Sequence, residues 1–304
     1  MKSPKIDQAS RRDIDGLVRR VLHDAGFREP PVDIGRVLDT LKLDREFYDL
    51  ENPGLLRRLR HTILVGGRRL SEFVEKVRLQ ALILFDDKRV LLDRGLPSLK
   101  HDWALAHEAG HELIPWHRPF SRGDTQNTLD PAWHEQLEAE ANYAASGLLF
   151  CGQAFTNDAR DTVPGWASVE NLRRRYRKNL LPTARRYVEL GPDHPMVILV
   201  STAAWDRKPD NQATRVRHLV LSPTFESSFK EPDPDVLRRT IDVHTHKRRG
   251  GAVGEFQCSL RDRNGDMHLF DVECFYNSYY VISLFVHRGP AAASVVMTAG
   301  AATA

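Results

Sequence analysis

Cysteines are few in this sequence, and long hydrophobic runs are missing. The 304 residues include three cysteines, Cys151, Cys258 and Cys274, which are widely spaced and form no C-x-x-C motif. An odd number of isolated cysteines argues against a disulfide framework, so we expect reduced, mostly buried thiols in a cytoplasmic protein. No apolar run reaches the length of a membrane span, and no apolar segment follows the positive charges at the N-terminus. We therefore expect neither a membrane protein nor a secretory signal.

A large net charge is missing as well. The sequence has 44 Lys and Arg residues against 41 Asp and Glu residues, which gives a formal net charge of +3. This balance is too even to argue for nucleic-acid binding by itself. Hydrophobic residues make up 41% and charged residues 28% of the chain, as in an ordinary globular protein with a full core. The length suggests about two domains.

The most informative stretch is residues 101–150, which contains the motif His107-Glu108-x-x-His111. Residues four apart on a helix lie about one turn apart on the same face, so His107 and His111 can bind one metal ion. Neutral imidazoles suit Zn²⁺, which with three protein ligands keeps one position open for water. Glu108 lies beside the first ligand, where its carboxylate can take a proton from that water as the water attacks a carbonyl group.

A second helix supplies the third ligand. Asp130 is a suitable N-cap and Pro131 a suitable first residue for this helix. Glu138 and Asn142 lie four apart on one face, so Glu138 can bind the metal while Asn142 hydrogen-bonds a ligand histidine. Glu140 competes as a ligand, but it lies about 200° around the helix from Glu138, and we choose Glu138. Small residues keep this helix thin enough to approach its neighbour: Ala139, Ala141, Ala144, Ala145 and Gly147.

A surface helix with a solvated His-Glu-His face is the alternative interpretation of the motif. The first helix is largely apolar, however, and Pro115 ends it. Two histidines and a glutamate on a buried helix need a partner, which favours a metal. The apolar residues that indicate burial are Trp103, Leu105, Ala106, Ala109 and Leu113.

The pattern over both helices is more specific than the motif alone. It consists of Leu105-Ala-His-Glu-Ala-Gly-His111, then Glu138-Ala-Glu-Ala-Asn142-Tyr-Ala-Ala145, and then Leu148-Leu149. This pattern resembles the ImmA/IrrE family of zinc metallopeptidases, and Val90-Leu-Leu-Asp93 and Lys100 match the residues that precede it. The resemblance covers roughly residues 10–190 and is loose outside the two helices. Where a proline commonly follows the two leucines, this chain has Phe150-Cys151-Gly152.

The resemblance implies a gluzincin-like fold and an intracellular endopeptidase. It also implies a substrate, a helix-turn-helix repressor whose cleavage switches on stress or mobile-element genes. The residues themselves predict that His107, His111 and Glu138 hold one Zn²⁺ per chain, that Glu108 activates the water, and that Asn142 orients a ligand histidine. An extended segment of the partner repressor is the expected substrate.

Several elements are expected before the metal-binding helices. Helices are predicted over residues 10–25 and 33–41, capped by Ser10 and Asp33, and a further helix over residues 71–80. Strands are predicted over residues 61–65, 81–85 and 89–93. The strand over residues 89–93 is our candidate for an exposed edge that holds an extended substrate, and an ordinary core hairpin is the alternative.

A polar loop over residues 117–128 is expected to line the cleft between the two helices. His117 or His134 can donate a hydrogen bond to the oxyanion that forms during hydrolysis, and Tyr143 is a further candidate. The alternative for either histidine is an ordinary exposed side chain.

Residues 161–195 form a basic helical segment that resembles a helix-turn-helix. Ser168 can cap its first helix, and a turn over residues 181–183 separates the two helices. The positive residues are Arg173, Arg174, Arg175, Arg177, Lys178, Arg185 and Arg186. Direct contact with DNA phosphates is one interpretation. We prefer a solvated arginine-rich face that docks on the peptidase core, because the net charge is low and the pattern is short.

Beyond a linker at residues 191–195 the chain changes to β character. Strands are predicted over residues 196–200, 216–221, 256–260, 268–275 and 279–286, and the turn at 263–266 indicates a hairpin. These form a smaller α/β domain with an antiparallel sheet, which the resemblance suggests to be a sensor module of GAF or PAS type. His244-Thr-His246 alone is weak support for a metal site. Residues 291–304 are small and uncharged, and we expect disorder there.

The sequence therefore predicts an α+β protein with a zincin-like metallopeptidase domain over residues 1–160, the basic segment over 161–195, and the C-terminal domain over 196–290. The main hypothesis is a zinc-dependent endopeptidase with a protein substrate. The alternative is a DNA-binding transcriptional regulator with a structural zinc site. Glu108 discriminates between them, because only hydrolysis needs a carboxylate at that position.

Overall fold

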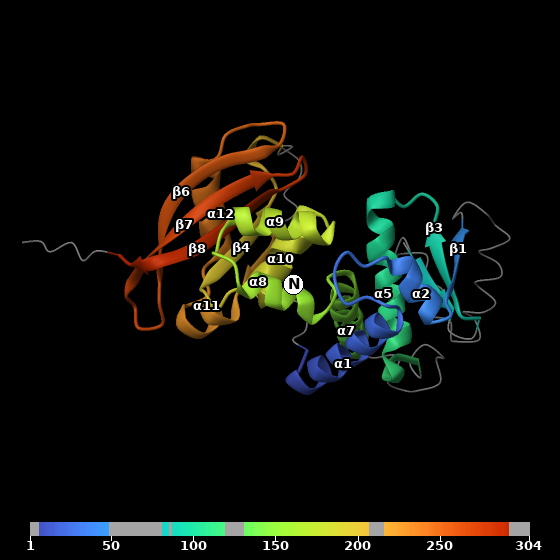
Figure 1. Ribbon diagram of the computed structural model, residues 1–304. Helices are drawn as coiled ribbons and strands as arrows, with labels where there is room; N and C mark the ends of the chain where they lie inside the picture. Colours follow the sequence, from blue (N-terminus) through green and yellow to red (C-terminus); the bar gives the residue numbers. More distant parts are fainter. Residues whose placement is uncertain (1–5, 49–80, 85–86, 119–130, 207–215, 292–304) are drawn as a thin grey trace, which may run out of the picture. The chain divides into compact units, whose positions relative to one another are not determined.

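The computed structural model describes residues 6–48, 81–84, 87–118, 131–206 and 216–291. The chain divides into two compact units, residues 1–155 and 156–304. Each unit combines helices with a sheet, in agreement with the predicted α+β class (Figure 1). The strand predicted over residues 61–65, the helix over 71–80, most of the loop over 117–128, the cap Asp130 and the tail from residue 292 lie outside the described residues.

Helix α1 (Gln8–Asp24) and helix α2 (Ile34–Thr40) open the N-terminal unit. The N-cap of α1 is Asp7 and not Ser10: the Asp7 carboxylate accepts the backbone N–H groups of Ala9 and Ser10 at 2.8 and 2.9 Å. An aspartate placed just before the first turn satisfies amide groups that have no partner within the helix. Asp33 caps α2 as predicted, accepting the Gly35 N–H at 2.8 Å.

The sheet of this unit contains strands β1 (Asp44–Tyr48), β2 (Ala81–Leu84) and β3 (Arg89–Asp93) in the order β1-β3-β2. The antiparallel β2–β3 pair confirms the hairpin. The prediction that Arg89–Asp93 is an exposed edge is wrong, because β1 pairs with it in parallel on its other side. Strand β1 was not predicted from its sequence, Asp-Arg-Glu-Phe-Tyr, because the polar residues do not alternate with apolar ones as in a half-buried strand.

Helix α5 (His101–Leu113) lies between this sheet and helix α7 (Pro131–Leu149), and α7 also packs against α1 (Figure 1). Gly110 makes the close approach of α5 and α7 feasible: a Cβ there would lie 2.8 Å from the Ala141 carbonyl oxygen. Ala141, Ala144 and Ala145 are fully buried. The small residues thus allow the close helix packing predicted for a shared ion. Helix α5 ends at Leu113, just before Pro115 opens the short η2 turn (Pro115–His117).

The C-terminal unit contains a five-stranded antiparallel sheet in the order β5-β4-β8-β7-β6. Its strands are β4 (Met196–Ser201), β5 (Val216–Leu221), β6 (Gly251–Arg261), β7 (Met267–Tyr276) and β8 (Val281–Pro290). The predicted β6–β7 hairpin is confirmed, with Gly265 in the left-handed region at φ 101°. Asp262 closes the turn by accepting the N–H groups of Gly265 and Asp266, each at 2.8 Å.

Helices cover both faces of strand β4, which is buried at every position. Helix α10 (Leu180–Leu190) packs on β4 and β5 and contacts α9 (Trp166–Tyr176), while α11 (Pro223–Ser228) and α12 (Pro234–His244) also contact β4. The basic segment is therefore part of this unit, and its docking on the peptidase core stays a prediction. Its apolar face decides the packing, through Trp166, Val169, Leu172, Tyr176, Tyr187 and Val188.

Candidate metal centre

The structure brings the three predicted ligands together between α5 and α7. The Nε2 atoms of His107 and His111 lie 3.2 Å apart. They lie 3.3 and 3.4 Å, respectively, from the two carboxylate oxygens of Glu138. Among the described residues, His107, His111 and Glu138 are the group whose ligand atoms converge closely enough to hold a metal ion.

The spacing of these atoms fits a tetrahedral ion. A tetrahedron with bonds of about 2.0–2.1 Å, as for zinc with nitrogen and oxygen ligands, has edges of about 3.3 Å. The distance between the two histidine nitrogens, and the distance from each nitrogen to one Glu138 oxygen, are close to this value, and the two histidines face different oxygens of that carboxylate. Glu138 keeps 40% of its side chain exposed, against 18% and 16% for the two histidines. The cluster is therefore open to solvent on the Glu138 side, where a fourth ligand can approach.

Asn142 contacts the first histidine as predicted. Its side-chain oxygen lies 3.1 Å from Nδ1 of His107. A hydrogen on Nδ1, donated to Asn142, leaves Nε2 free to bind a cation. Burial lowers the pKa of His107, but its hydrogen bond to Glu138 and the charges of Glu108 and Glu138 outweigh burial, so the net pKa is raised.

The second histidine is held by a chain of hydrogen bonds that sequence reasoning missed. Nδ1 of His111 lies 2.9 Å from Nδ1 of His117, and Nε2 of His117 lies 3.1 Å from Glu140. For His111 to offer Nε2 to a cation, its Nδ1–H must donate to His117, whose Nε2–H then donates to Glu140. Burial lowers the pKa of His111 to about 4 despite its hydrogen bond to Glu138, so the ring is neutral near pH 7, as a ligand must be.

Glu140 is thus neither a ligand nor a surface residue. Trp116 Nε1 and Gln136 Nε2 donate to its two oxygens at 2.7 and 2.9 Å. His117 keeps 1% of its side chain exposed, so the prediction that it stabilises an oxyanion is wrong. Two features of the sequence could have indicated this hydrogen-bonded group. Gln136 and Glu140 lie four apart on one face of α7, and His117 closely follows the helix that carries His107 and His111.

Glu108 lies in the interior beside the cluster, between α5 and the sheet. Burial raises its pKa to about 7; the charge of His107 and the backbone N–H of Ile83 in β2 lower it, and the charge of Glu138 raises it. A carboxylate with a pKa near the working pH is suited to accept and return a proton. Burial would also raise the pKa of Glu138, but the hydrogen bonds and charges of both imidazoles lower it far below its ordinary value.

Glu112, which follows His111, has a different environment. Its buried carboxylate accepts from Lys88 and Arg118 on one oxygen, Oε1. Lys88 occupies the left-handed region at φ 50°, at the turn before β3. These contacts join the end of α5 to the β2–β3 hairpin, so Glu112 connects the helix that carries His107 and His111 to the sheet.

The remaining oxyanion candidates have other surroundings. The Tyr143 hydroxyl donates to the Asp15 carboxylate on α1 at 3.1 Å. Its ring also carries the Arg11 guanidinium at 5.6 Å from the centroid. His134 is exposed on the first turns of α7, four residues before Glu138 on the same helical face. His134 therefore stays a prediction, whereas Tyr143 is committed to the contact between α1 and α7.

The basic segment is largely neutralised by acidic neighbours. Its ion pairs join Arg173 and Arg174 to Glu170, Arg175 to Asp158, and Arg185 to Glu189. Pairs on an exposed face contribute little stability, but they cancel charge that would otherwise attract phosphates. Arg186 is buried within the unit. This pattern favours a solvated helical face over a DNA-contacting one.

Two expectations from composition can be compared with the described residues. Cys151, Cys258 and Cys274 are all free thiols; Cys151 and Cys274 are buried and Cys258 is half-buried. Burial raises the pKa of Cys258 to about 12 and that of Cys274 to about 11, so neither is a reactive thiolate. Within the part of the chain that the structure describes, no helix has the length and apolar character needed to cross a bilayer.

The comparisons with known proteins identify a shared fold but do not identify a family. No family model matches the sequence, and no curated protein matches it. Solved structures that resemble the chain include a Mycobacterium tuberculosis transcriptional regulator with a TM-score of 0.53. The two sequences are 13% identical, and the match covers 90% of this chain and 88% of that one. At this identity the likeness establishes a shared fold, and the chemistry must be argued from the metal centre.

Proposed function

We propose that this protein is a zinc-dependent endopeptidase that acts on a partner protein in transcription regulation. The observation that carries the proposal is the convergence of His107, His111 and Glu138, whose ligand atoms lie within 4.8 Å of one another, with Glu108 buried beside them. A purely structural site has no use for a carboxylate at the position of Glu108. Hydrolysis of a peptide bond requires one, because a proton must leave the attacking water and reach the departing amine.

Each residue of the centre has a defined task in this proposal. A bound Zn²⁺ would act as a Lewis acid, polarising the substrate carbonyl group and making a water molecule more acidic. Glu108 accepts the proton of the attacking water and passes it to the leaving nitrogen. Asn142 and the His117–Glu140 pair fix the tautomers of His107 and His111, so that both Nε2 atoms stay available for the cation.

The identity of the substrate rests on resemblance and on the fold neighbour. The likeness of residues 105–149 to the ImmA/IrrE pattern supports a zincin-like N-terminal domain and a helix-turn-helix repressor as substrate. The transcriptional regulator found among similar structures is compatible with a role in gene control. The same resemblance supports a sensor module of GAF or PAS type for the C-terminal sheet, which makes regulation by a bound molecule part of the proposal.

The decisive experiment compares wild type with Glu108→Gln. Zinc content is measured by elemental analysis, and cleavage is measured on the helix-turn-helix repressor encoded beside the gene. We expect about one zinc per chain in both proteins, with the cleavage rate of the variant lower by about 10²–10⁴-fold. Glu135→Gln is the matched control, because Glu135 is exposed on α7 and undergoes the same chemical change. Equal cleavage by wild type and Glu108→Gln would refute the proposal.

The second candidate is a DNA-binding regulator whose zinc is structural. The name of the similar structure favours this candidate, whereas the ion pairs of the basic segment oppose it. Replacing Arg173, Arg174 and Arg175 with alanine tests it. If that variant loses binding to duplex DNA and still cleaves, the basic segment has a function of its own. If wild type binds zinc, cleaves nothing and binds DNA, the second candidate replaces the first.

A further inference from the structure

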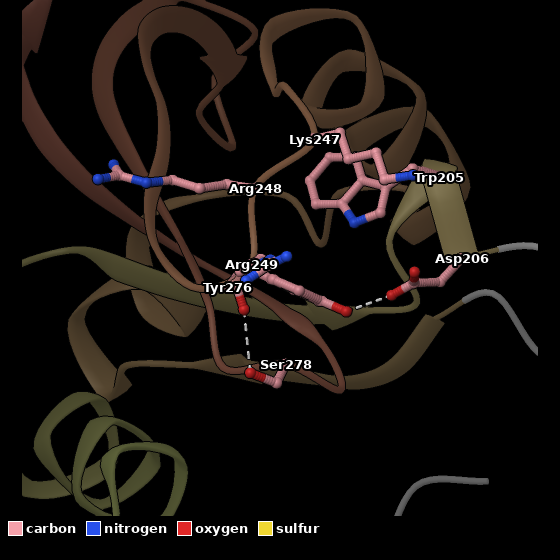
Figure 2. Close-up of a pocket in the computed structure, with 7 residues that line it drawn as sticks. All are labelled: Trp205, Asp206, Lys247, Arg248, Arg249, Tyr276 and Ser278. Atoms are coloured by element: carbon pink, nitrogen blue, oxygen red, sulfur yellow. Dashed lines mark hydrogen bonds between the residues drawn. The ribbon is translucent and has the colours of Figure 1, made fainter.

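The C-terminal unit contains a pocket of about 690 Å³ that belongs to none of the chemistry described above. It is lined by the short helix η4 (Ala204–Asp206), by the segment that joins α12 to β6, and by the end of β7 with the turn that follows (Figure 2). Pockets that bind small molecules have volumes of about 300–1,000 Å³. The size therefore suits one small ligand.

Three consecutive cationic residues, Lys247, Arg248 and Arg249, line one side of this pocket. Arg248 is held by the backbone, since its Nη1 donates to the Ala252 carbonyl at 2.9 Å, and its side chain extends away from Trp205 (Figure 2). Lys247 and Arg249 are exposed, and no carboxylate within the described residues forms an ion pair with either. Their charges are therefore available to an anion.

The segment that carries these cations has a fixed backbone. The Ser278 hydroxyl donates to the Arg249 carbonyl at 3.1 Å, and a Cβ added at Gly250 would lie 3.5 Å from the Tyr276 carbonyl oxygen. The one carboxylate that lines the pocket, Asp206, accepts the hydroxyl of Tyr276 (Figure 2). Asp206 keeps its negative charge, but the lining sets three cations against this one carboxylate. The pocket is thus positive, with its cations on an anchored loop.

Two aromatic rings also line the pocket, and Figure 2 shows Lys247 near Trp205 and Arg249 near Tyr276. The rings of Trp205 and Tyr276 meet edge to face, with centroids 5.4 Å apart. The indole Nε1–H of Trp205 is buried, and it interacts with the Tyr276 hydroxyl, lowering the pKa of that group against the larger opposite effect of Asp206. Trp205 thus offers a surface for stacking.

We infer that this pocket binds a nucleoside phosphate, with the base against Trp205 and the phosphates on Lys247 and Arg249. Phosphate oxygens accept charge-assisted hydrogen bonds from lysine and arginine, and bases stack on aromatic side chains irrespective of sequence. The volume of the pocket fits one nucleotide, whereas a nucleic-acid strand needs an extended groove. The arginines of α9 and α10 that could extend such a groove are paired with carboxylates. The site does not depend on the proposed endopeptidase function.

Calorimetric titration of the full chain with ADP tests the inference, with adenosine, inorganic phosphate and an oligothymidylate as separate ligands. We expect ADP to bind with a Kd below about 100 μM at low salt. Lys247→Gln/Arg249→Gln should raise this Kd at least about tenfold, because two charge-assisted contacts are lost. Trp205→Leu should raise it by a similar factor through lost stacking. The matched control is Lys230→Gln/Arg239→Gln, two exposed cations of the same unit that do not line the pocket.

Each other result would overturn the inference in a different way. Absence of ADP binding, or an unchanged Kd in Lys247→Gln/Arg249→Gln, would remove the pocket as a nucleotide site. Inorganic phosphate binding as tightly as ADP would show an anion site in which Trp205 has no part. Oligothymidylate that binds more tightly than ADP, and is lost in the same double variant, would show a single-strand binding surface instead. Circular dichroism of each variant separates loss of binding from loss of fold.

Discussion

The described part of this protein contains two clusters of histidines, one in each compact unit, and they differ in where the ring nitrogens point. In the first, Nε2 of His107 and His111 converge with Glu138 on one point. In the second, His194, His268 and His287 also lie close together, with His268 Nδ1 at 3.0 Å from His287 Nε2. His194 Nε2, however, donates to the His287 carbonyl at 2.7 Å.

The comparison shows that closeness of histidines does not make a metal site. A cation needs several lone pairs directed at one point, with the hydrogens placed on the opposite ring nitrogens. In the first cluster, Asn142 and His117 accept those hydrogens. In the second cluster, the ring nitrogens form hydrogen bonds with one another and with a backbone carbonyl. The following predictions test this difference, from the largest expected effect to the smallest.

Removing a predicted ligand should give the largest difference in zinc affinity between substitutions in the two clusters. We expect His107→Ala to lower zinc affinity at least about 1,000-fold, equivalent to about 4 kcal/mol. His287→Ala in the second cluster should leave zinc affinity unchanged. A competition titration against a chromophoric chelator measures both variants. If His287→Ala releases zinc, the second cluster also holds a metal, and the contrast drawn above is wrong.

Breaking the hydrogen-bond chain behind His111 should have an intermediate effect. His117→Ala removes the acceptor for His111 Nδ1–H, and we expect zinc affinity to fall about 10–100-fold. His117→Gln offers an acceptor in a similar place and should restore part of the loss. The chelator competition distinguishes the two variants. Equal losses would mean that His117 contributes packing and does not orient the ligand.

The close approach of α5 and α7 provides a prediction about stability. In Gly110→Ala, the new Cβ would lie 2.8 Å from the Ala141 carbonyl, so the helices must separate. We expect the free energy of unfolding to fall by about 1–3 kcal/mol, with weaker zinc binding. In Gly16→Ala on α1, nothing lies within 4 Å of the new Cβ. That variant should gain about 0.4–1 kcal/mol, because alanine restricts the unfolded chain. Urea denaturation measures both.

The smallest predicted effect is the pH dependence of folding stability that the second cluster contributes. Burial and the charges of His268 and His194 lower the pKa of His287 below its ordinary value of 6.5. The unfolded chain therefore binds this proton at a higher pH than the folded chain does. The contribution of neutral His287 to stability is complete above pH 6.5 and is lost as the pH falls toward the folded-state pKa. His287→Gln should flatten this part of the stability profile relative to wild type in denaturation series between pH 7.5 and 5. An unchanged slope would contradict the lowered pKa.

Local features of the fold were predictable because they depend on residues near one another in the chain. The four-residue spacing of His107 and His111, and of Glu138 and Asn142, places each pair on one helical face whatever surrounds it. Asp33 caps a helix and the turn at residues 263–266 closes a hairpin for equally local reasons. These features were sufficient to predict both helices of the candidate metal centre and the three side chains that converge there.

Features that depend on distant partners were decided by the tertiary structure. The parallel pairing of β1 makes Arg89–Asp93 a central strand, and no periodicity in β1 indicates this. The packing of Glu140 against Trp116 and His117 excludes it as a ligand and assigns it a supporting role. The nucleotide pocket likewise forms only where three segments, separated by up to about seventy residues, meet. The sequence by itself determined which side chains share a helical face, because helix geometry is local, whereas only packing decided which of those faces meet.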